Sequence, residues 1–124
     1  GNLKVAYSRN DDKIFAQTPD YEGYTTALVQ TILGSPEKQI TDPAYIAESF
    51  ENTELENIKG LYHEGKITGE QAHAFLMGAV DLKQASKFGV DYTIYTYKNN
   101  TIQLVFENDQ LLYITPNPDV VFFK

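Results

Sequence analysis

Hydrophobic and polar residues alternate at both ends of the chain and follow a helical spacing in its middle. Near the N-terminus, residues 3–7 alternate, residues 9–12 (Arg-Asn-Asp-Asp) have turn chemistry, and residues 14–16 are apolar. Short segments of this kind around a polar turn predict a β-hairpin.

Helix-start signals divide the middle of the chain. Thr18-Pro19-Asp20 precedes apolar residues at helical spacing that end at Gly34, and Asp42-Pro43 begins a second helical stretch. The apolar spacing then slips, and Thr53 with Glu56 fits a capping box at the slip. The sequence therefore predicts either two short helices or one kinked helix before the stretch that follows.

That stretch, LYHEGKITGEQAHAFL (residues 61–76), contains the only two histidines of the chain. One interpretation is a metal site, because Glu70 and His73 are spaced to share a helical face, as in di-iron carboxylate bundles. Such bundles use two copies of this motif and two further glutamates, whereas the chain has one copy. His63 also lies ten residues before His73, which excludes the zinc-protease motif.

The other interpretation is a corner between two helices, and it accounts for more of the residues. Gly65 suits the left-handed end of a helix, and Thr68 with Gln71 fits a capping box. Ile67 is placed to pack against Ala72 as a hydrophobic staple. We therefore expect a helical corner here, followed by a helix over residues 69–87.

The alternation returns after Gly89 and predicts an antiparallel meander of three or four strands, with turns at Asn99-Asn100 and Asn108-Asp109 and a last strand over residues 120–123. Helices in the middle and strands at the ends favour an α+β fold. We expect one domain, residues 1–124, with an N-terminal β-hairpin and three to four central helices packed on one face of the C-terminal meander. Cystatin-like and cone-shaped folds share this plan by analogy only.

Composition excludes several classes of function. The net charge is −7 with a single arginine, so the clustered Lys and Arg that nucleic acids and anionic membranes require are missing. The absence of cysteine excludes disulfides and thiolate zinc sites. No apolar run approaches the roughly 20 residues that span a bilayer. Because the chain begins Gly-Asn-Leu-Lys, we expect an exported protein whose targeting segment has been removed; the alternative is a fragment of a longer chain.

Two features point to binding. Residues 42–64 carry six acids against one lysine, so we expect an acidic surface, including Glu48, Glu51 and Glu54, that attracts a basic partner. We also expect an outward sheet face bearing tyrosines, a residue favoured at interfaces, namely Tyr95, Tyr97 and Tyr113. The plainer explanations are a solvated helix face and the high strand propensity of tyrosine.

The sequence therefore predicts a non-enzymatic module that binds a protein or a small polar ligand through these residues. Particular versions are an inhibitor or immunity-type protein that blocks a basic enzyme, and an accessory domain of an exported lipoprotein. The alternative is a metal-dependent or acid–base enzyme that uses His63, Glu70 and His73. No cofactor is expected, and a homodimer is compatible with this interpretation.

Overall fold

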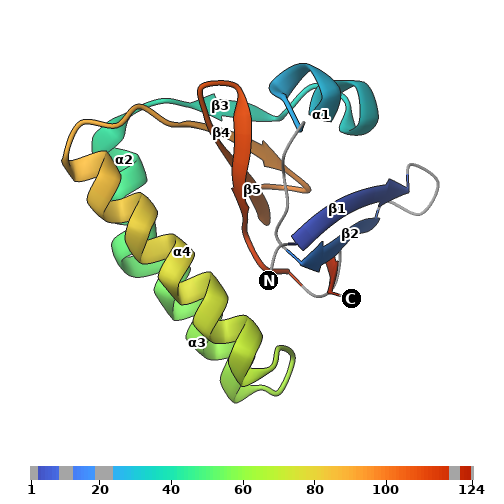
Figure 1. The fold of residues 1–124 in the computed structure, drawn as a ribbon, viewed down its shortest axis with the longest axis vertical. Coiled ribbons are helices and arrows are strands. Elements are labelled where there is room, and N and C mark those ends of the chain that lie inside the picture. The colour runs from blue at the N-terminus through green and yellow to red at the C-terminus, as the bar shows by residue number, and fades with distance from the viewer. Residues whose placement is uncertain (1–2, 9–12, 19–23, 118–120, 124) are drawn as a thin grey trace. The chain divides into compact units, whose positions relative to one another are not determined.

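The structure of the chain, a computed structural model, describes residues 3–8, 13–18, 24–117 and 121–123 (Figure 1). These residues form an α+β fold, as predicted. The chain divides into two compact units: residues 1–39 with 93–124, here called the sheet unit, and residues 40–92, the helical unit. That the two units make up a single domain stays a prediction.

Three strands of the sheet unit form the predicted antiparallel meander. They are β4 (Thr93–Tyr97), β5 (Ile102–Glu107) and β6 (Gln110–Ile114), which pair in chain order. The turns between them are at the predicted positions, where Asn and Asp residues have positive φ, a conformation that they tolerate better than most residues. Beside β4 lies β3 (Lys38–Ile40), which is too short to show a period in the sequence.

A second sheet joins strands from the two ends of the chain. β1 (Leu3–Ser8) pairs antiparallel with β2 (Lys13–Thr18), and β7 (Val121–Phe123) pairs parallel with β2. The predicted hairpin stays a prediction, because its turn, residues 9–12, lies outside the described residues. The sequence left open whether the last strand is a fourth strand of the meander, and the structure places it in the other sheet. It follows a proline-rich break and pairs with a strand that is distant in sequence.

Helix α1 (Thr26–Leu33) begins later than the sequence predicted. Thr18 ends β2, and the helix is instead capped by Thr25, whose hydroxyl accepts a hydrogen bond from the backbone N–H of Leu28 at 3.1 Å. The end of the helix is as predicted, at Gly34 with a φ of 87°. Both threonines have a hydroxyl that can cap a helix. Thr18 lies in a strand, because it pairs with β1, and Thr25 caps α1 instead.

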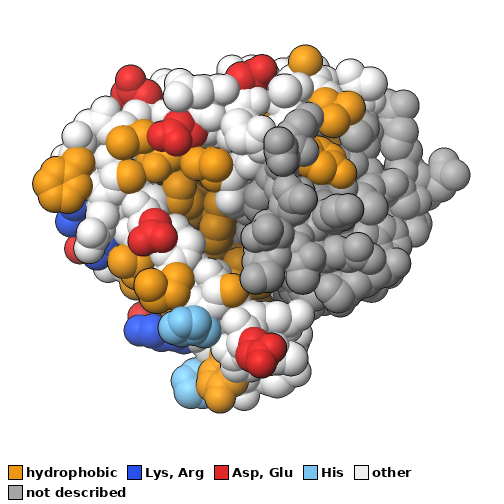
Figure 2. Space-filling view, viewed as in Figure 1, with side chains coloured by type: hydrophobic (Ala, Val, Ile, Leu, Met, Phe, Trp, Pro, Cys, Tyr) orange, Lys and Arg blue, Asp and Glu red, His pale blue; other side chains and the backbone are white. Residues whose placement is uncertain are grey.

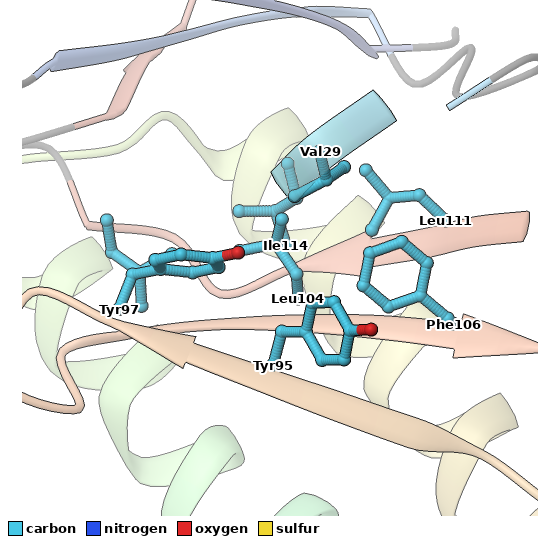
Figure 3. Close-up of a cluster of buried hydrophobic side chains, with 8 residues drawn as sticks. Val29, Tyr95, Tyr97, Leu104, Phe106, Leu111 and Ile114 are labelled. Atoms are coloured by element: carbon cyan, nitrogen blue, oxygen red, sulfur yellow. The ribbon is translucent and has the colours of Figure 1, made fainter. Parts of the chain in front are cut away.

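The core of the sheet unit lies between α1 and one face of the meander (Figure 3). Val29 of α1 is fully buried there. It belongs to a cluster with side chains of the three meander strands, namely Tyr95, Tyr97, Ile102, Leu104, Phe106, Leu111 and Ile114. The rings of Tyr95 and Phe106 are tilted at 55° with centroids 5.0 Å apart, which favours aromatic attraction.

The helical unit contains two continuous helical segments, so with α1 the described residues form three helices where the sequence predicted three to four. In the first, α2 (Pro43–Glu48), a π-helical turn η1 (Ser49–Thr53) and α3 (Glu54–His63) follow without interruption. The second, α4 (Gly69–Lys87), packs against all three. That these helices lie on a sheet face stays a prediction. None of the described helices has the length and apolar character needed to cross a membrane.

The π-helical turn explains the slip in the apolar spacing. Ile46, Phe50, Glu54 and Ile58 are all buried and lie four residues apart. In an α-helix of 3.6 residues per turn such a stripe drifts around the helix, and the wider π turn brings it back to one side. The capping box predicted at Thr53 is wrong: Thr53 is helical, and its side chain makes no capping bond. Burial of the stripe keeps the helix continuous.

The corner between α3 and α4 has the predicted geometry. Gly65 has a φ of 73°, and the N–H groups of Gly65 and Lys66 donate to carbonyls of the last turn of α3 at 3.0 and 2.9 Å. Thr68 and Gln71 form the predicted capping box, with both reciprocal hydrogen bonds present at 3.1 and 2.8 Å. The residues next to the start of α4 therefore determine where this helix begins.

Thr96 in β4 offers a stabilising substitution. Its side chain is fully buried, and its hydroxyl has no hydrogen-bond partner within the described part of the chain. A buried hydroxyl without a partner costs roughly 1–3 kcal/mol. Thr96→Val keeps the shape, so we expect it to raise the free energy of unfolding in urea by about 1 kcal/mol or more. Thr101→Val is the control, because the Thr101 hydroxyl donates to Lys98 O at 2.6 Å. An unchanged Thr96→Val variant would contradict this prediction.

Candidate functional site

The three tyrosines predicted to form an outward face are buried. Tyr95, Tyr97 and Tyr113 are 5, 6 and 5% exposed. Tyr95 and Tyr97 lie on the face that α1 covers. Gln30 Nε2 of the helix donates to the Tyr95 oxygen at 2.9 Å, and the Tyr97 hydroxyl donates to O of Gly34, the C-cap, at 3.0 Å. A binding role for these side chains stays a prediction, and for Tyr95 and Tyr97 it would require α1 to move.

Burial also changes the chemistry of Tyr97. It raises the pKa of Tyr97 from 10.0 to about 12, and neighbouring Tyr95 adds to the shift. Because folding favours the neutral phenol, the stabilisation from this group is full below its unfolded pKa of 10.0 and is lost as the pH rises through about 12.

We therefore expect Tyr97 to ionise late when tyrosinate absorbance is followed against pH. Subtracting the absorbance titration of Tyr97→Phe from that of the wild type should isolate this ionisation, with a midpoint near pH 12. Tyr62→Phe, which removes a half-exposed phenol, is the matched control. If the Tyr97 difference is centred at the ordinary value of 10.0, the burial of this hydroxyl is not as the structure has it.

The two histidines are both exposed, and Figure 2 shows them on the surface. His63 is in the last turn of α3, and its ring centroid lies 5.8 Å from that of Tyr62. Among the described residues, no three His, Cys, Asp or Glu side chains come close enough together to hold a metal ion. The structure therefore does not bring His63, Glu70 and His73 into one metal site, and the enzymatic alternative stays a prediction.

Of the three glutamates predicted to form an acidic binding surface, two lie on the surface and one is buried. Glu48 and Glu51 are exposed, whereas Glu54 is only 4% exposed and continues the buried stripe, with Asn57 Nδ2 at 3.4 Å from its carboxylate. Glu51 lies 3.4 Å from the ammonium of Lys87 at the C-terminal end of α4. Glu51 thus adjoins the end of α4, and Glu54 does not contribute to that surface.

Sequence reasoning missed exposed apolar side chains on the helical unit. Among the described residues of this unit, the large ones are Tyr45, Tyr62, Met77 and Phe88. Phe88 is 88% exposed and directly follows Lys87 at the end of α4. The exposure of Phe88 could have been predicted from the sequence, because residue 88 falls outside the helical spacing of the buried residues of α4, namely Ala72, Phe75, Ala79, Leu82 and Ser86. Figure 2 shows apolar side chains among acidic ones on the face that it displays.

Contacts between α2, η1 and α4 place these groups together. Ser86 Oγ donates to Pro43 O at 3.2 Å, and the ion pair between Lys87 and Glu51 follows one residue later along α4. We use the name α4-end surface for four exposed residues: Glu48, Glu51, Lys87 and Phe88. It combines an unburied aromatic ring with two carboxylates one helical turn apart and a single ammonium.

Comparisons with known proteins give a family and no function. No curated protein and no solved structure matches the chain. A family model described as "Domain of unknown function (DUF4947)" matches residues 1–123. Because this match covers nearly the whole chain, the protein belongs to the DUF4947 domain family.

Proposed function

We propose that the protein is a non-enzymatic binding module that recognises a basic protein partner through the α4-end surface. The observation that carries this proposal is Phe88, a large aromatic side chain left 88% exposed beside the Glu51–Lys87 ion pair. Exposing a phenylalanine to water is unfavourable, and a partner that buries it regains that free energy. Aromatic anchors of this kind dominate many protein interfaces.

The charge of the helical unit supports a basic partner. Residues 40–92 hold nine of the seventeen Asp and Glu residues and four of the ten basic ones, so they contribute −5 of the net −7. A field of one sign accelerates association with a partner of the opposite sign. An inhibitor-type protein that blocks a basic enzyme is the version of this function that fits the charge.

The buried tyrosines favour this surface over the sheet face as the first contact. Tyr95 and Tyr97 are already packed under α1, so a partner would have to displace a helix to reach them. Phe88 is accessible without any rearrangement of its own unit.

Site-specific cross-linking tests the proposal. A photoreactive phenylalanine analogue replaces Phe88 in one variant and Leu112, which is 40% exposed on β6, in the control. We expect a single basic protein to be cross-linked at position 88 and not at position 112. Cross-links of equal yield at both positions, or an acidic partner at position 88, would overturn the proposal.

A further inference from the structure

Helix α1 is fastened to the meander by one carboxylate at each end. At the N-terminal end, Asp109 Oδ1 in the β5–β6 turn accepts hydrogen bonds from the Thr26 backbone N–H, at 3.0 Å, and from the Thr26 hydroxyl. Beyond the C-terminal end, the Glu37 carboxylate accepts from the backbone N–H groups of Asn99 and Asn100 in the β4–β5 turn, both at 2.9 Å. We call Asp109 and Glu37 the carboxylate anchors.

The anchors depend on negative charge. Asp109 reaches from the sheet to the first turn of the helix, where an anion is favoured by the helix dipole. Glu37 follows α1 and accepts hydrogen bonds from Asn99 and Asn100, two successive residues with positive φ. The N–H groups of such a turn converge on one anion. Hydrogen bonds to an ionised acceptor are about twice as strong as those to a neutral one. The Asp109 carboxylate is exposed, so protons reach it directly.

Besides the anchors, α1 is held on the sheet by the hydrogen bonds of Tyr95 and Tyr97 to Gln30 and Gly34 and by little apolar burial. The helix has eight residues, which is shorter than isolated helices that persist in water. Of its described side chains, Val29 is the one that is fully buried, with Leu33 partly buried against the same cluster. Burial of one valine is comparable in free energy with a few hydrogen bonds to charged groups. The anchors are therefore part of what holds α1 in place, together with the hydrogen bonds to Tyr95 and Tyr97.

We propose that α1 is an acid-releasable cover on the buried tyrosine face: protonation of Asp109 frees α1 from its N-terminal end while β4, β5 and β6 stay paired. The face that is uncovered carries Tyr95, Tyr97 and Phe106. This device lies in the sheet unit and does not depend on the function proposed for the helical unit.

The direction of the pH effect follows from Asp109. Its two hydrogen bonds from Thr26 lower the pKa of the Asp109 carboxyl below its ordinary value of 3.8. A lowered folded pKa contributes stability above the unfolded value, and this stability is lost as the pH falls through the folded pKa. The residues of α1 carry no charge; the charged residues of the surrounding strands and turns are Lys38, Lys98 and Glu107.

Hydrogen exchange of the whole chain tests the release. Exchange rates of the amides of α1 and of β4–β5 are compared from neutral pH to below 3.8, after correction for the intrinsic pH dependence. In the wild type, we expect the protection of α1 to fall several-fold with acid while β4–β5 keeps its protection. The double variant Asp109→Asn, Glu37→Gln keeps neutral acceptors at both positions and should lose this response.

A second variant distinguishes the loss of an anchor from misfolding of the chain. Asp109→Gly deletes one anchor, suits the φ of 66°, and creates Asn-Gly, which favours this two-residue hairpin turn. We expect α1 in this variant to lose protection already at neutral pH, with β5–β6 still paired. The proposal is overturned if α1 and β4–β5 lose protection together in the wild type. It is equally overturned if the acid response of α1 survives in the double variant.

Discussion

Replacing Phe106 with alanine is expected to lower the free energy of unfolding by about 3–5 kcal/mol, among the largest effects of a single substitution in this chain. Phe106 is 1% exposed and lies in the cluster under α1, with its ring centroid 5.0 Å from that of Tyr95. The substitution removes buried apolar surface and leaves a cavity. It also removes an aromatic pair worth about 0.5–1.5 kcal/mol.

Urea unfolding followed by circular dichroism measures this loss. The control is Leu112→Ala on the neighbouring strand β6, where the side chain is 40% exposed; we expect a loss of about 1 kcal/mol or less. Similar losses in the two variants would mean that the core of the sheet unit is not where the structure places it.

A second substitution, Phe50→Ala, is expected to cost a similar amount, about 3–5 kcal/mol, but in the helical unit. Phe50 is fully buried and sits within the π-helical turn η1, between Ile46 and Glu54 on the same buried stripe. Removing its ring takes away the apolar contact that favours the wider turn. We therefore expect the loss of stability to be accompanied by faster amide exchange in residues 49–53.

Met77→Ala is the matched control for Phe50→Ala, since Met77 lies on α4 of the same unit and is 49% exposed. It should change the free energy of unfolding by about 1 kcal/mol or less. If Phe50→Ala is as mild as this control, the buried stripe does not hold the helical unit together.

Features set by neighbouring residues were predictable from the sequence. The capping box of Thr68 and Gln71, the helix ends at Gly34 and Gly65, and the Asn99-Asn100 turn all occur as expected. In each case the required φ or side-chain acceptor is a property of a few adjacent residues.

Features that depend on distant residues were not predictable. Thr53 has a local capping signal, yet the burial of Phe50 and Ile58 on one stripe keeps the backbone helical there. The pairing of β7 with β2 joins residues more than one hundred positions apart, and alternation within a strand does not specify its partner.

In the candidate site, too, local features were predictable and features that depend on distant residues were not. Alternation placed Tyr95 and Tyr97 on one face of a strand, which the structure bears out. It gave no information on which face α1 would cover. The exposure of Phe88 could be predicted from helical spacing, but the nearness of the preceding residue, Lys87, to Glu51 depends on how α4 packs against η1.

The most direct test of the binding claim is the affinity of the cross-linked partner for wild type, Phe88→Ala and the double variant Glu48→Gln, Glu51→Gln, measured at low and at physiological salt. We predict that Phe88→Ala weakens binding at least about tenfold at both salt concentrations, as expected for an aromatic anchor. The double variant should weaken it mainly at low salt, where exposed charges are least screened. Affinities equal to that of the wild type for both variants would contradict the claim that the α4-end surface is the binding site.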